Sequence, residues 1–424
     1  MKKTEKFDNG INLITHKLSN THCVTISVNF KVGSIYETAE NNGITHLIEH
    51  LFFRQWDNLN QEKLYYEMMS MGAEIIGKTY NDFVSFSITV VPDYFIKAFS
   101  LIIRCLNNFK WNEQSISLEK RVVCKQIENS YQSFQNWIDY YYFKNTVYEH
   151  LIMGTSETIN SLSVDAINSW KEKYFCCNNS CIIITGNYSD KDLTDCYRVL
   201  SKINNHGKSL GGITYLPQNF NNRNYINRFS IINDDSDNTE VTVFLDVNKE
   251  YDFETVRLLS AILGEGCGSI LSKILREENG LTDDVYTSLM CFDGFYRLSN
   301  SFTVKNDDFF QSMLYFFEGI KKLKKNISKE EYQSSICFFT INQIMDLDNT
   351  KTLNDRYVLC DFVLPSIISE PFALKEKYEK ITRDDLQNYS TQIFTSNNIS
   401  FLIQTNNDAN EVKSYLENLV NDLD

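Results

Sequence analysis

The first half of this 424-residue chain alternates between short β-branched runs and longer stretches in which apolar residues recur at helical spacing. Strand patterns with alternating or continuous apolar residues occur at 24–32, 82–91 and 181–185. Helical patterns occur at 61–71, 93–109, 164–175 and 191–203, and a long one begins at Glu113. Together these patterns predict one α/β unit in the first two hundred residues.

The same order of elements begins again in the second half. Residues 205–228 are rich in Gly and Asn and contain one of four prolines, which predicts a linker. Beyond it we expect strands at 239–247, 296–304 and 399–404, and helices at 253–263, 270–278, 307–323 and from Lys329. The sequence therefore predicts two copies of one α/β design, with domains at 1–204 and 229–424.

Composition narrows the class of protein. A hydrophobic content of 42% is typical of a globular chain, and a formal net charge of −14 argues against nucleic acid as a partner. No apolar run is long enough for a signal-peptide core or a membrane span. We therefore expect a cytoplasmic protein whose eleven cysteines are reduced. Cys176, Cys177 and Cys181 form one cluster, for which buried thiols and a structural zinc site are alternatives.

Residues 46–50 read His-Leu-Ile-Glu-His. On a helix, His46 and His50 share one face, where both rings can bind one metal ion, and Glu49 lies beside the second histidine. This is the H-x-x-E-H order of the inverzincins. Zinc takes two imidazole nitrogens, a third protein ligand and a water whose pKa falls to about 7. The motif predicts a Zn²⁺ site with Glu49 as general base, and chance occurrence on a buried helix is the alternative.

The setting of this motif is more specific than the motif alone. Residues 31–54 (KVGSIYETAENNGITHLIEHLFFR) hold a glycine, an acidic residue, Asn-Gly and H-x-x-E-H. In order and spacing they resemble the insulinase, pitrilysin and mitochondrial-processing-peptidase family of zinc metallopeptidases. Segments 71–82, 118–128 and 264–281 are similar to further family segments. The resemblance implies an α+β fold of two similar α/β domains, each a mainly antiparallel sheet with helices packed on one face, together forming half of a clamshell.

The resemblance also implies roles for single residues. At the metal they are His46 and His50 as zinc ligands, Glu49 as general base and Glu119 as a supporting carboxylate. Ile76 and Gly77 would lie on an edge strand that pairs with extended substrate. Arg276 would hold substrate near the scissile bond. The family often places a tyrosine seven residues after that arginine, whereas here the position is Asp283 and the nearest tyrosine is Tyr286. A solvated charge at a helix end is the alternative for Arg276.

The third zinc ligand departs from the family pattern. The family has a glutamate seven residues after the position of Glu119, about 700° further and so nearly on the same helical face. That residue is Gln126 here. Gln126 offers a neutral oxygen where the family has an anion, so zinc binding should be weaker. Mutating residues that only support the ligands typically lowers metal affinity by about 10–100-fold, and loss of a charged ligand should cost at least as much. Glu128 is the alternative ligand, although at about 900° it lies on the opposite face of a regular helix.

Two functions follow from these residues. The intact motif predicts a zinc metalloendopeptidase subunit that hydrolyses peptides, possesses the fold of a half-size family member, and works as a dimer with a related chain. Removal of a leader from a ribosomally made precursor peptide would suit such a pair. The alternative, motivated by Gln126, is a weak or inactive partner that binds peptide and supports an active relative.

Overall fold

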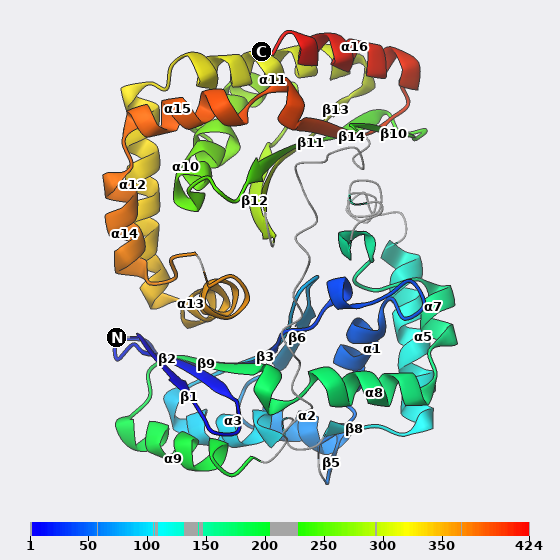
Figure 1. Cartoon of the computed structure of the whole chain (residues 1–424), viewed down its shortest axis with the longest axis vertical. Coiled ribbons are helices and arrows are strands. Elements are labelled where there is room, and N and C mark those ends of the chain that lie inside the picture. Colours follow the sequence, from blue (N-terminus) through cyan, green and yellow to red (C-terminus); the bar gives the residue numbers. More distant parts are fainter. Residues whose placement is uncertain are drawn as a thin grey trace. The chain divides into compact units, whose positions relative to one another are not determined.

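The computed structural model describes residues 2–56, 58–104, 106, 109–130, 143, 147–203, 228–292, 295–365 and 367–423. The chain forms two compact units (Figure 1). The first comprises Met1–Tyr140, Asn145–Thr214 and Ile344–Pro371, and the second comprises Tyr141–Lys144, Tyr215–Gln343 and Phe372–Asp424. The expected linker at 205–228 lies outside the described residues, except for Arg228.

The first unit contains a mixed six-stranded sheet. Its strands are β1 (Lys2–Lys6), β2 (Asn12–Lys17), β3 (Val24–Phe30), β6 (Ile75–Thr79), β7 (Val84–Val90) and β9 (Ser180–Gly186). They are ordered β1-β2-β9-β3-β7-β6, so β6 forms one edge. Only β2 and β9 run parallel among these pairs. Every residue of β3 is buried, because helices cover both faces of the sheet at its centre.

The second unit repeats this topology. Its strands are β10 (Phe229–Asn233), β11 (Asn238–Asn248), β12 (Tyr286–Phe292), β13 (Phe295–Lys305) and β14 (Ile399–Thr405). They are ordered β10-β14-β11-β13-β12, and only β10 and β14 pair in parallel. With β1 set aside, the strands of each sheet follow the order 1-5-2-4-3 along the chain. The expected pair of similar, mainly antiparallel α/β domains is thus confirmed.

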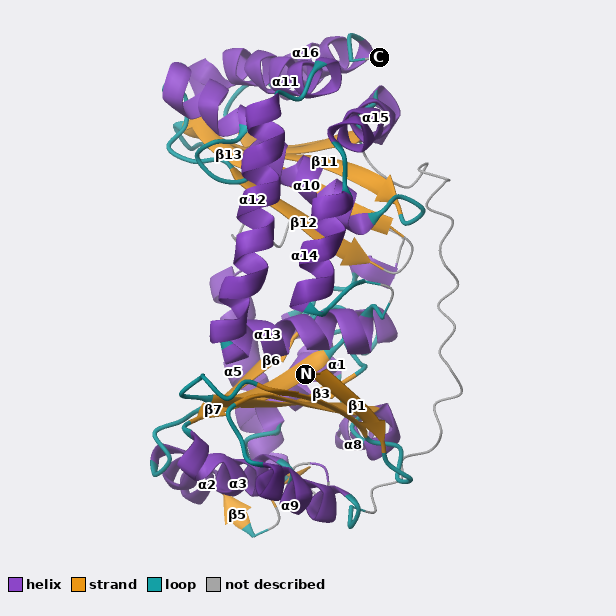
Figure 2. Ribbon diagram, turned by 90° about the vertical axis from the view of Figure 1, so that its left-hand side faces the viewer, coloured by secondary structure: helices purple, strands orange, loops and turns teal. Residues whose placement is uncertain are grey.

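Helices form layers on the first sheet. They are α1 (Ile44–Leu51), α2 (Gln61–Met69), α3 (Phe95–Ile102), α5 (Glu113–Ser130), α7 (Ser156–Ser161), α8 (Val164–Tyr174), α9 (Asp190–Leu200) and α13 (Thr350–Tyr357), which continues as π-helical turns over Val358–Val363. Figures 1 and 2 show α2, α3 and α9 on one face and α13 on the other. The helix α13 is held there by Asn354, which donates to the Ile183 carbonyl at 3.1 Å, and by Thr350, whose carbonyl accepts from Thr185 at 2.7 Å.

The second unit contains its own set of helices. They are α10 (Phe253–Gly264), a π-helix at Ser272–Glu278, α11 (Phe309–Lys325), α12 (Lys329–Met345), α14 (Pro371–Lys380), α15 (Arg383–Ile393) and α16 (Ala409–Asn421). The last two residues of α12 and the first residue of α14 belong to the first unit. Residues 344–371 therefore join the first unit, although they follow most of the second unit in sequence.

Some expected elements differ from those observed. The helix expected over 93–109 was too long, since α3 ends at Ile102 and Phe109 belongs to β8 (Phe109–Lys110). That strand pairs with β4 (Gln55–Trp56), which also pairs with β5 (Leu59–Asn60), and the buried Phe109 lies opposite the buried Trp56. Pairing between distant segments thus ended a helical pattern that the local sequence would have continued.

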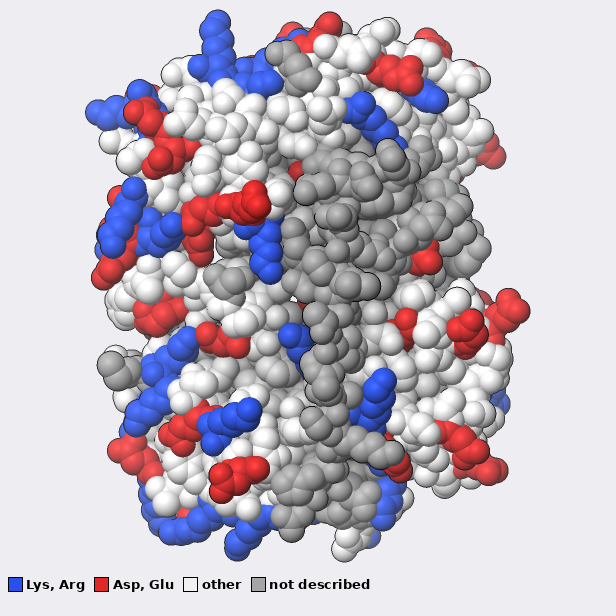
Figure 3. Space-filling view, in the orientation of Figure 1, with Lys and Arg blue, Asp and Glu red and all other residues white. Residues whose placement is uncertain are grey.

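The surface carries charges of both signs. Figure 3 shows Lys and Arg side chains interspersed with Asp and Glu on the face in view. Acidic residues exceed basic ones by 55 to 41 in the whole chain. Among the described residues, no helix combines the length and the apolar character that crossing a membrane requires.

Candidate metal centre

The helix α1 carries the H-x-x-E-H residues and begins at a glycine. Gly43 has a φ of 91°, and a Cβ atom there would lie 2.5 Å from the Met153 carbonyl oxygen, so only glycine fits without strain. The buried Glu37 carboxylate accepts hydrogen bonds from the backbone N–H groups of Gly43 at 2.7 Å and Thr45 at 2.9 Å. Burial raises the pKa of Glu37, and these hydrogen bonds oppose the rise. A carboxylate at this end of a helix also complements the helix dipole.

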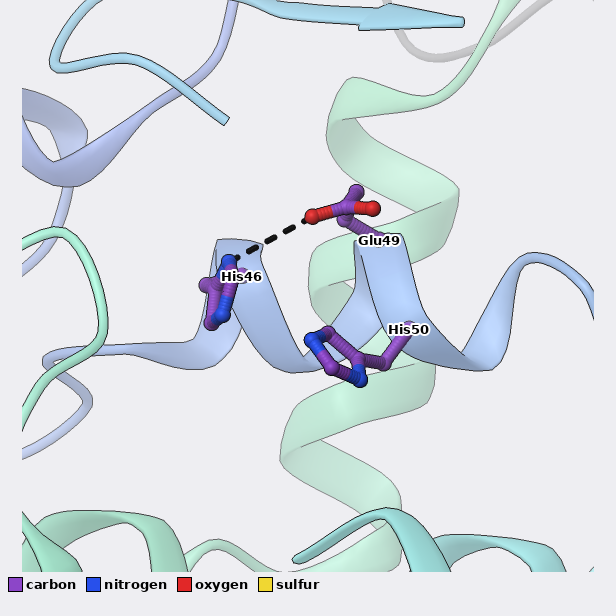
Figure 4. Close-up of side chains that lie close together, drawn as sticks. All are labelled: His46, Glu49 and His50. Carbon is purple, nitrogen blue, oxygen red and sulfur yellow. Dashed lines mark ion pairs between the residues drawn. The ribbon is translucent and has the colours of Figure 1, made fainter. Parts of the chain in front are cut away.

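The motif side chains lie close together on one face of α1 (Figure 4). The rings of His46 and His50 have centroids 4.8 Å apart, and His46 Nδ1 lies 3.4 Å from Glu49 Oε2. One ligand atom from each of these three residues lies within 4.8 Å of the others. Among the described residues, His46, Glu49 and His50 are the His, Cys, Asp or Glu side chains that lie close enough together to hold a metal ion. His46 and Glu49 are buried, with 7% and 8% of their surfaces exposed.

Gln126 on α5 reaches the two histidines. Its Oε1 lies 3.1 Å from His46 Nε2, and the Gln126 side chain also acts to raise the pKa of His50. Two ligands about 2.05 Å from one tetrahedral zinc ion are themselves separated by roughly 3.3 Å, so the observed distance suits ligands of a common ion. Glu128 is exposed, and no hydrogen bond joins it to either histidine among the described residues.

Behind His50 lies a row of alternating charges. Glu119 Oε2 is 3.2 Å from His50 Nδ1, and the other Glu119 oxygen pairs with the Arg54 guanidinium. Burial acts to raise the pKa of Glu119, but His50 and Arg54 outweigh it and the pKa is lowered. Burial acts to lower the pKa of His50, whereas Glu119, Glu49 and Gln126 together raise it. The contact with Glu119 occupies Nδ1 of His50 and leaves Nε2 for a metal ion, as in other carboxylate–histidine–zinc arrangements.

The edge strand β6 lies next to Glu49. Thr79 Oγ1 donates a hydrogen bond of 3.3 Å to Glu49 Oε2. A Cβ atom on Gly77 would lie 2.2 Å from Glu49 Oε1, so the missing side chain at Gly77 gives the carboxylate its place. Ile76, the next residue, is 41% exposed and lies on the opposite face of the strand. The structure thus brings Gly77 to the candidate base and turns Ile76 away from it.

The donor set fits zinc. His46 Nε2 faces Gln126 Oε1, the contact of His50 Nδ1 with Glu119 leaves Nε2 of that ring for an ion, and two imidazoles with an amide oxygen are suitable ligands for a borderline-soft dication. His46, His50 and Gln126 would hold the ion, with Glu49 beside it and Glu119 fixing the second histidine. Glu49 would place a carboxylate beside the ion, whereas the charge of Glu119 is balanced by Arg54.

The remaining candidates lie elsewhere. Arg276 is in the second unit on the π-helix, half-exposed, and forms an ion pair of 3.6 Å with Glu277. Tyr286, at the start of β12, is 68% exposed. In the cysteine cluster, Cys177 and Cys181 are buried, and burial raises the pKa of Cys181 well above its usual range. A buried, protonated thiol is the chemistry of a core residue rather than a metal ligand.

Sequence reasoning did not assign three residues that hold the site together: Glu37, Arg54 and Thr79. A signal for Glu37 was present, because an acidic residue shortly before Asn-Gly and a helix is a candidate N-terminal cap. Arg54 lies four residues after His50, which is one turn along the same face if the helix continues. The contact of Thr79 with Glu49 had no local signal, because it depends on how β6 meets α1.

Models of two protein domains match the chain. The one described as insulinase (peptidase family M16) matches residues 13–155, and the one described as the peptidase M16 inactive domain matches residues 161–336. The chain belongs to peptidase family M16. The first match contains His46, Glu49, His50 and Gln126, and the second covers most of the second unit's sheet.

Proteins similar to this M16 chain match either nearly all of it or about half of it. An uncharacterized zinc protease of Rickettsia felis is 24% identical over 421 residues, covering 95% of this chain and 97% of that protein. Subunit 1 of the mitochondrial cytochrome b-c1 complex of Rattus norvegicus is 25% identical over 192 residues, or 44% of this chain and 40% of that protein. A crystal structure of a protease from Helicobacter pylori has a TM-score of 0.83 at 17% identity, covering 96% of this chain and 99% of that one.

Proposed function

We propose that this protein is a zinc-dependent metalloendopeptidase subunit that hydrolyses peptides. One observation carries the proposal: the buried His46 and Glu49 and the partly buried His50 converge on one face of α1, and the Gln126 oxygen lies 3.1 Å from His46 Nε2. Membership of family M16 and relatives named zinc proteases support it.

The protein's own residues would position and move a proton. A zinc ion bound here supplies a Lewis acid that makes a water acidic enough to ionise near neutral pH. Glu49 accepts that proton and passes it to the leaving amine, and Thr79 orients the carboxylate through its 3.3 Å hydrogen bond. Glu119 holds His50 in one tautomer through the contact at Nδ1, and Arg54 keeps Glu119 ionised.

The substrate would bind along β6. This strand pairs with β7 on one side and forms the edge of the sheet, so the backbone groups of its other side can pair with an extended peptide. Gly77 of β6 meets Glu49, and a peptide paired there would pass beside the metal site. Ile76 and Gly77 would act through their backbone groups, which can pair with a peptide whatever side chain position 76 carries.

The finer parts of the proposal concern partners and location. We propose that the chain works in the cytoplasm as a dimer with a related subunit, and that its substrate is a ribosomally made precursor peptide. Arg276, half-exposed and close in sequence to Tyr286, would contribute to holding the substrate. Mass measurement by size-exclusion chromatography with light scattering, with and without a related chain, tests the dimer. A stable, active monomer would contradict it.

A second candidate function is a weak or inactive partner that binds peptide. It is favoured by Gln126, which brings no charge to the ion, and by the match to a relative named as a cytochrome b-c1 subunit rather than as a protease. The presence of His46, Glu49 and His50 together favours activity, because an inactive subunit does not need the base and both ligands.

Zinc content and peptide cleavage distinguish the two functions. The purified complex should bind one zinc ion per chain, cleave unfolded peptides, and lose cleavage on chelation. Glu49→Gln should lower kcat by at least about a hundredfold while retaining zinc, because it removes the base but no ligand. Glu128→Gln on α5 is the matched control and should change neither zinc content nor kcat. Absence of bound zinc, together with unchanged cleavage by Glu49→Gln, would exclude the catalytic function.

A further inference from the structure

A groove lies beside the edge strand β6, on the face of the first sheet that is opposite to Glu49. It has a volume of about 910 Å³. Ile76 lines it, and Ser87, which pairs with Ile76, forms part of its floor together with Thr89, also on β7. Its far wall is formed by Asp348 and Asn349 and by the first two residues of α13, Thr350 and Lys351. Figure 2 shows α13 across this face of the sheet. All of these residues belong to the first unit.

Exposed apolar side chains line the part of the groove next to β6, where Glu74 also lies. Met69 at the end of α2 is 70% exposed and Ile76 is 41% exposed, and both line the groove together with the buried Ala73. Exposed large apolar side chains beside a concavity are typical of a binding surface. Contact of Met69 and Ile76 with an apolar ligand group would be favourable, because it would remove their exposed apolar surface from water.

The polar floor does not demand a charged or polar ligand. Thr25 lies between the floor and α13, with its hydroxyl 2.9 Å from that of Thr89 and 2.8 Å from that of Thr350. These hydroxyls already have partners within the protein. Charged groups of both signs, Glu74, Asp348 and Lys351, also line the groove, so it carries no strong field of one sign.

The groove and the candidate metal site lie on opposite faces of β6, so a peptide paired with this strand would present side chains to both. Side chains of a paired peptide alternate between the two faces of a sheet, as do those of the strand it pairs with. A substrate residue beside Gly77 would face Glu49 and the metal ligands, and its neighbour beside Ile76 would face the groove. Every second side chain of an extended substrate would therefore point to the face of the sheet that carries the groove, and the one beside Ile76 would enter it.

We propose that this groove binds a large apolar side chain of the peptide substrate, one residue along from the residue that faces Glu49. The proposal rests on the proposed function, because it requires a peptide along β6. It assigns to Met69, Ile76 and the start of α13 the selection of substrate by side chain, separate from the cleavage chemistry. The occupant is an uncharged apolar residue such as Phe or Leu.

Binding and cleavage are measured separately to test this. The zinc-loaded full chain carrying Glu49→Gln is titrated with fluorescent decapeptides of one Thr- and Ser-rich background, in which Phe, Ser, Asp or Lys occupies alternate positions. We expect the Phe peptides to bind about 10- to 100-fold more tightly than the Ser peptides. Met69→Lys should abolish this preference. Tyr66→Lys should retain it, because Tyr66 is 63% exposed on the same helix and does not line the groove.

Each outcome decides the proposal. Equal binding of Phe and Ser peptides, equal effects of Met69→Lys and Tyr66→Lys, or no binding of any peptide would overturn it. Ile76→Thr should also weaken the preference for Phe peptides. This second variant retains a β-branched residue in the strand, so the test does not depend on the folding of Met69→Lys alone. The unmodified protein is assayed for cleavage of the same peptides. Cleavage without apolar preference overturns the groove alone, and apolar-selective binding without cleavage overturns the catalytic function alone.

Discussion

Replacing Gln126 by glutamate should restore an anionic ligand at the metal. The carboxylate would occupy the position of the Gln126 amide group, whose Oε1 lies 3.1 Å from His46 Nε2. Because Gln126 is exposed, solvent screens part of the added charge, and we take the lower end of the range of about 10–100 for changes around a metal ion. Zinc affinity should therefore rise about tenfold, equivalent to about 1.4 kcal/mol.

The rise in zinc affinity should also increase the free energy of unfolding measured in the presence of zinc. At free zinc of about 100 times the dissociation constant of the unmodified protein, binding stabilises that protein by about 2.7 kcal/mol. The variant would be at about 1,000 times its own dissociation constant and would gain about 4.1 kcal/mol. Calorimetric titration with zinc measures the first quantity, and denaturant unfolding with zinc or with chelator measures the second.

Two further variants on α5 make this test specific. Gln126→Ala should weaken zinc binding, because it removes the oxygen, and Glu128→Gln should leave it unchanged. If both substitutions at Gln126 leave the affinity unaltered and Glu128→Gln lowers it, the ligand is Glu128. The assignment of helical faces on α5 would then be refuted.

Three other predictions follow from single contacts. Gly77→Val should lower kcat severely by displacing the Glu49 carboxylate, while thermal denaturation stays nearly unchanged, because valine suits a strand; full activity would exclude the contact. Glu37→Gln should lower the unfolding free energy of the first unit by about 1–3 kcal/mol, measured with denaturant, because a donor replaces one buried acceptor at the start of α1. Burial lowers the pKa of His16, which bonds the Tyr357 hydroxyl at 2.5 Å, to about 4 from its ordinary 6.5. Only the unfolded state binds the proton between these values, so stability should be complete above pH 6.5 and fall by up to about 3 kcal/mol towards pH 4, and an equally steep fall in His16→Gln would contradict this.

The sequence predicted the candidate metal site because its main residues are local. Three of them lie within one turn and a half of α1, and the seven-residue spacing of Glu119 and Gln126 places both on one face of α5. The central strands were also predictable, since β3, β7 and β9 are continuous or alternating apolar runs. Periodicity of this kind is a property of neighbouring residues and needs no knowledge of the fold.

Only the tertiary structure decided how these segments meet. The strand order 1-5-2-4-3, the return of residues 344–371 to the first unit, and the approach of β6 to Glu49 all join residues far apart in the chain. The cost of closing a loop grows slowly with its length, so sequence separation hardly restricts which segments pair. Which segments pair depends instead on how whole faces of helices and sheets pack together. The Thr79 hydroxyl and the missing Cβ of Gly77 acquire a function only when that packing brings them to the Glu49 carboxylate.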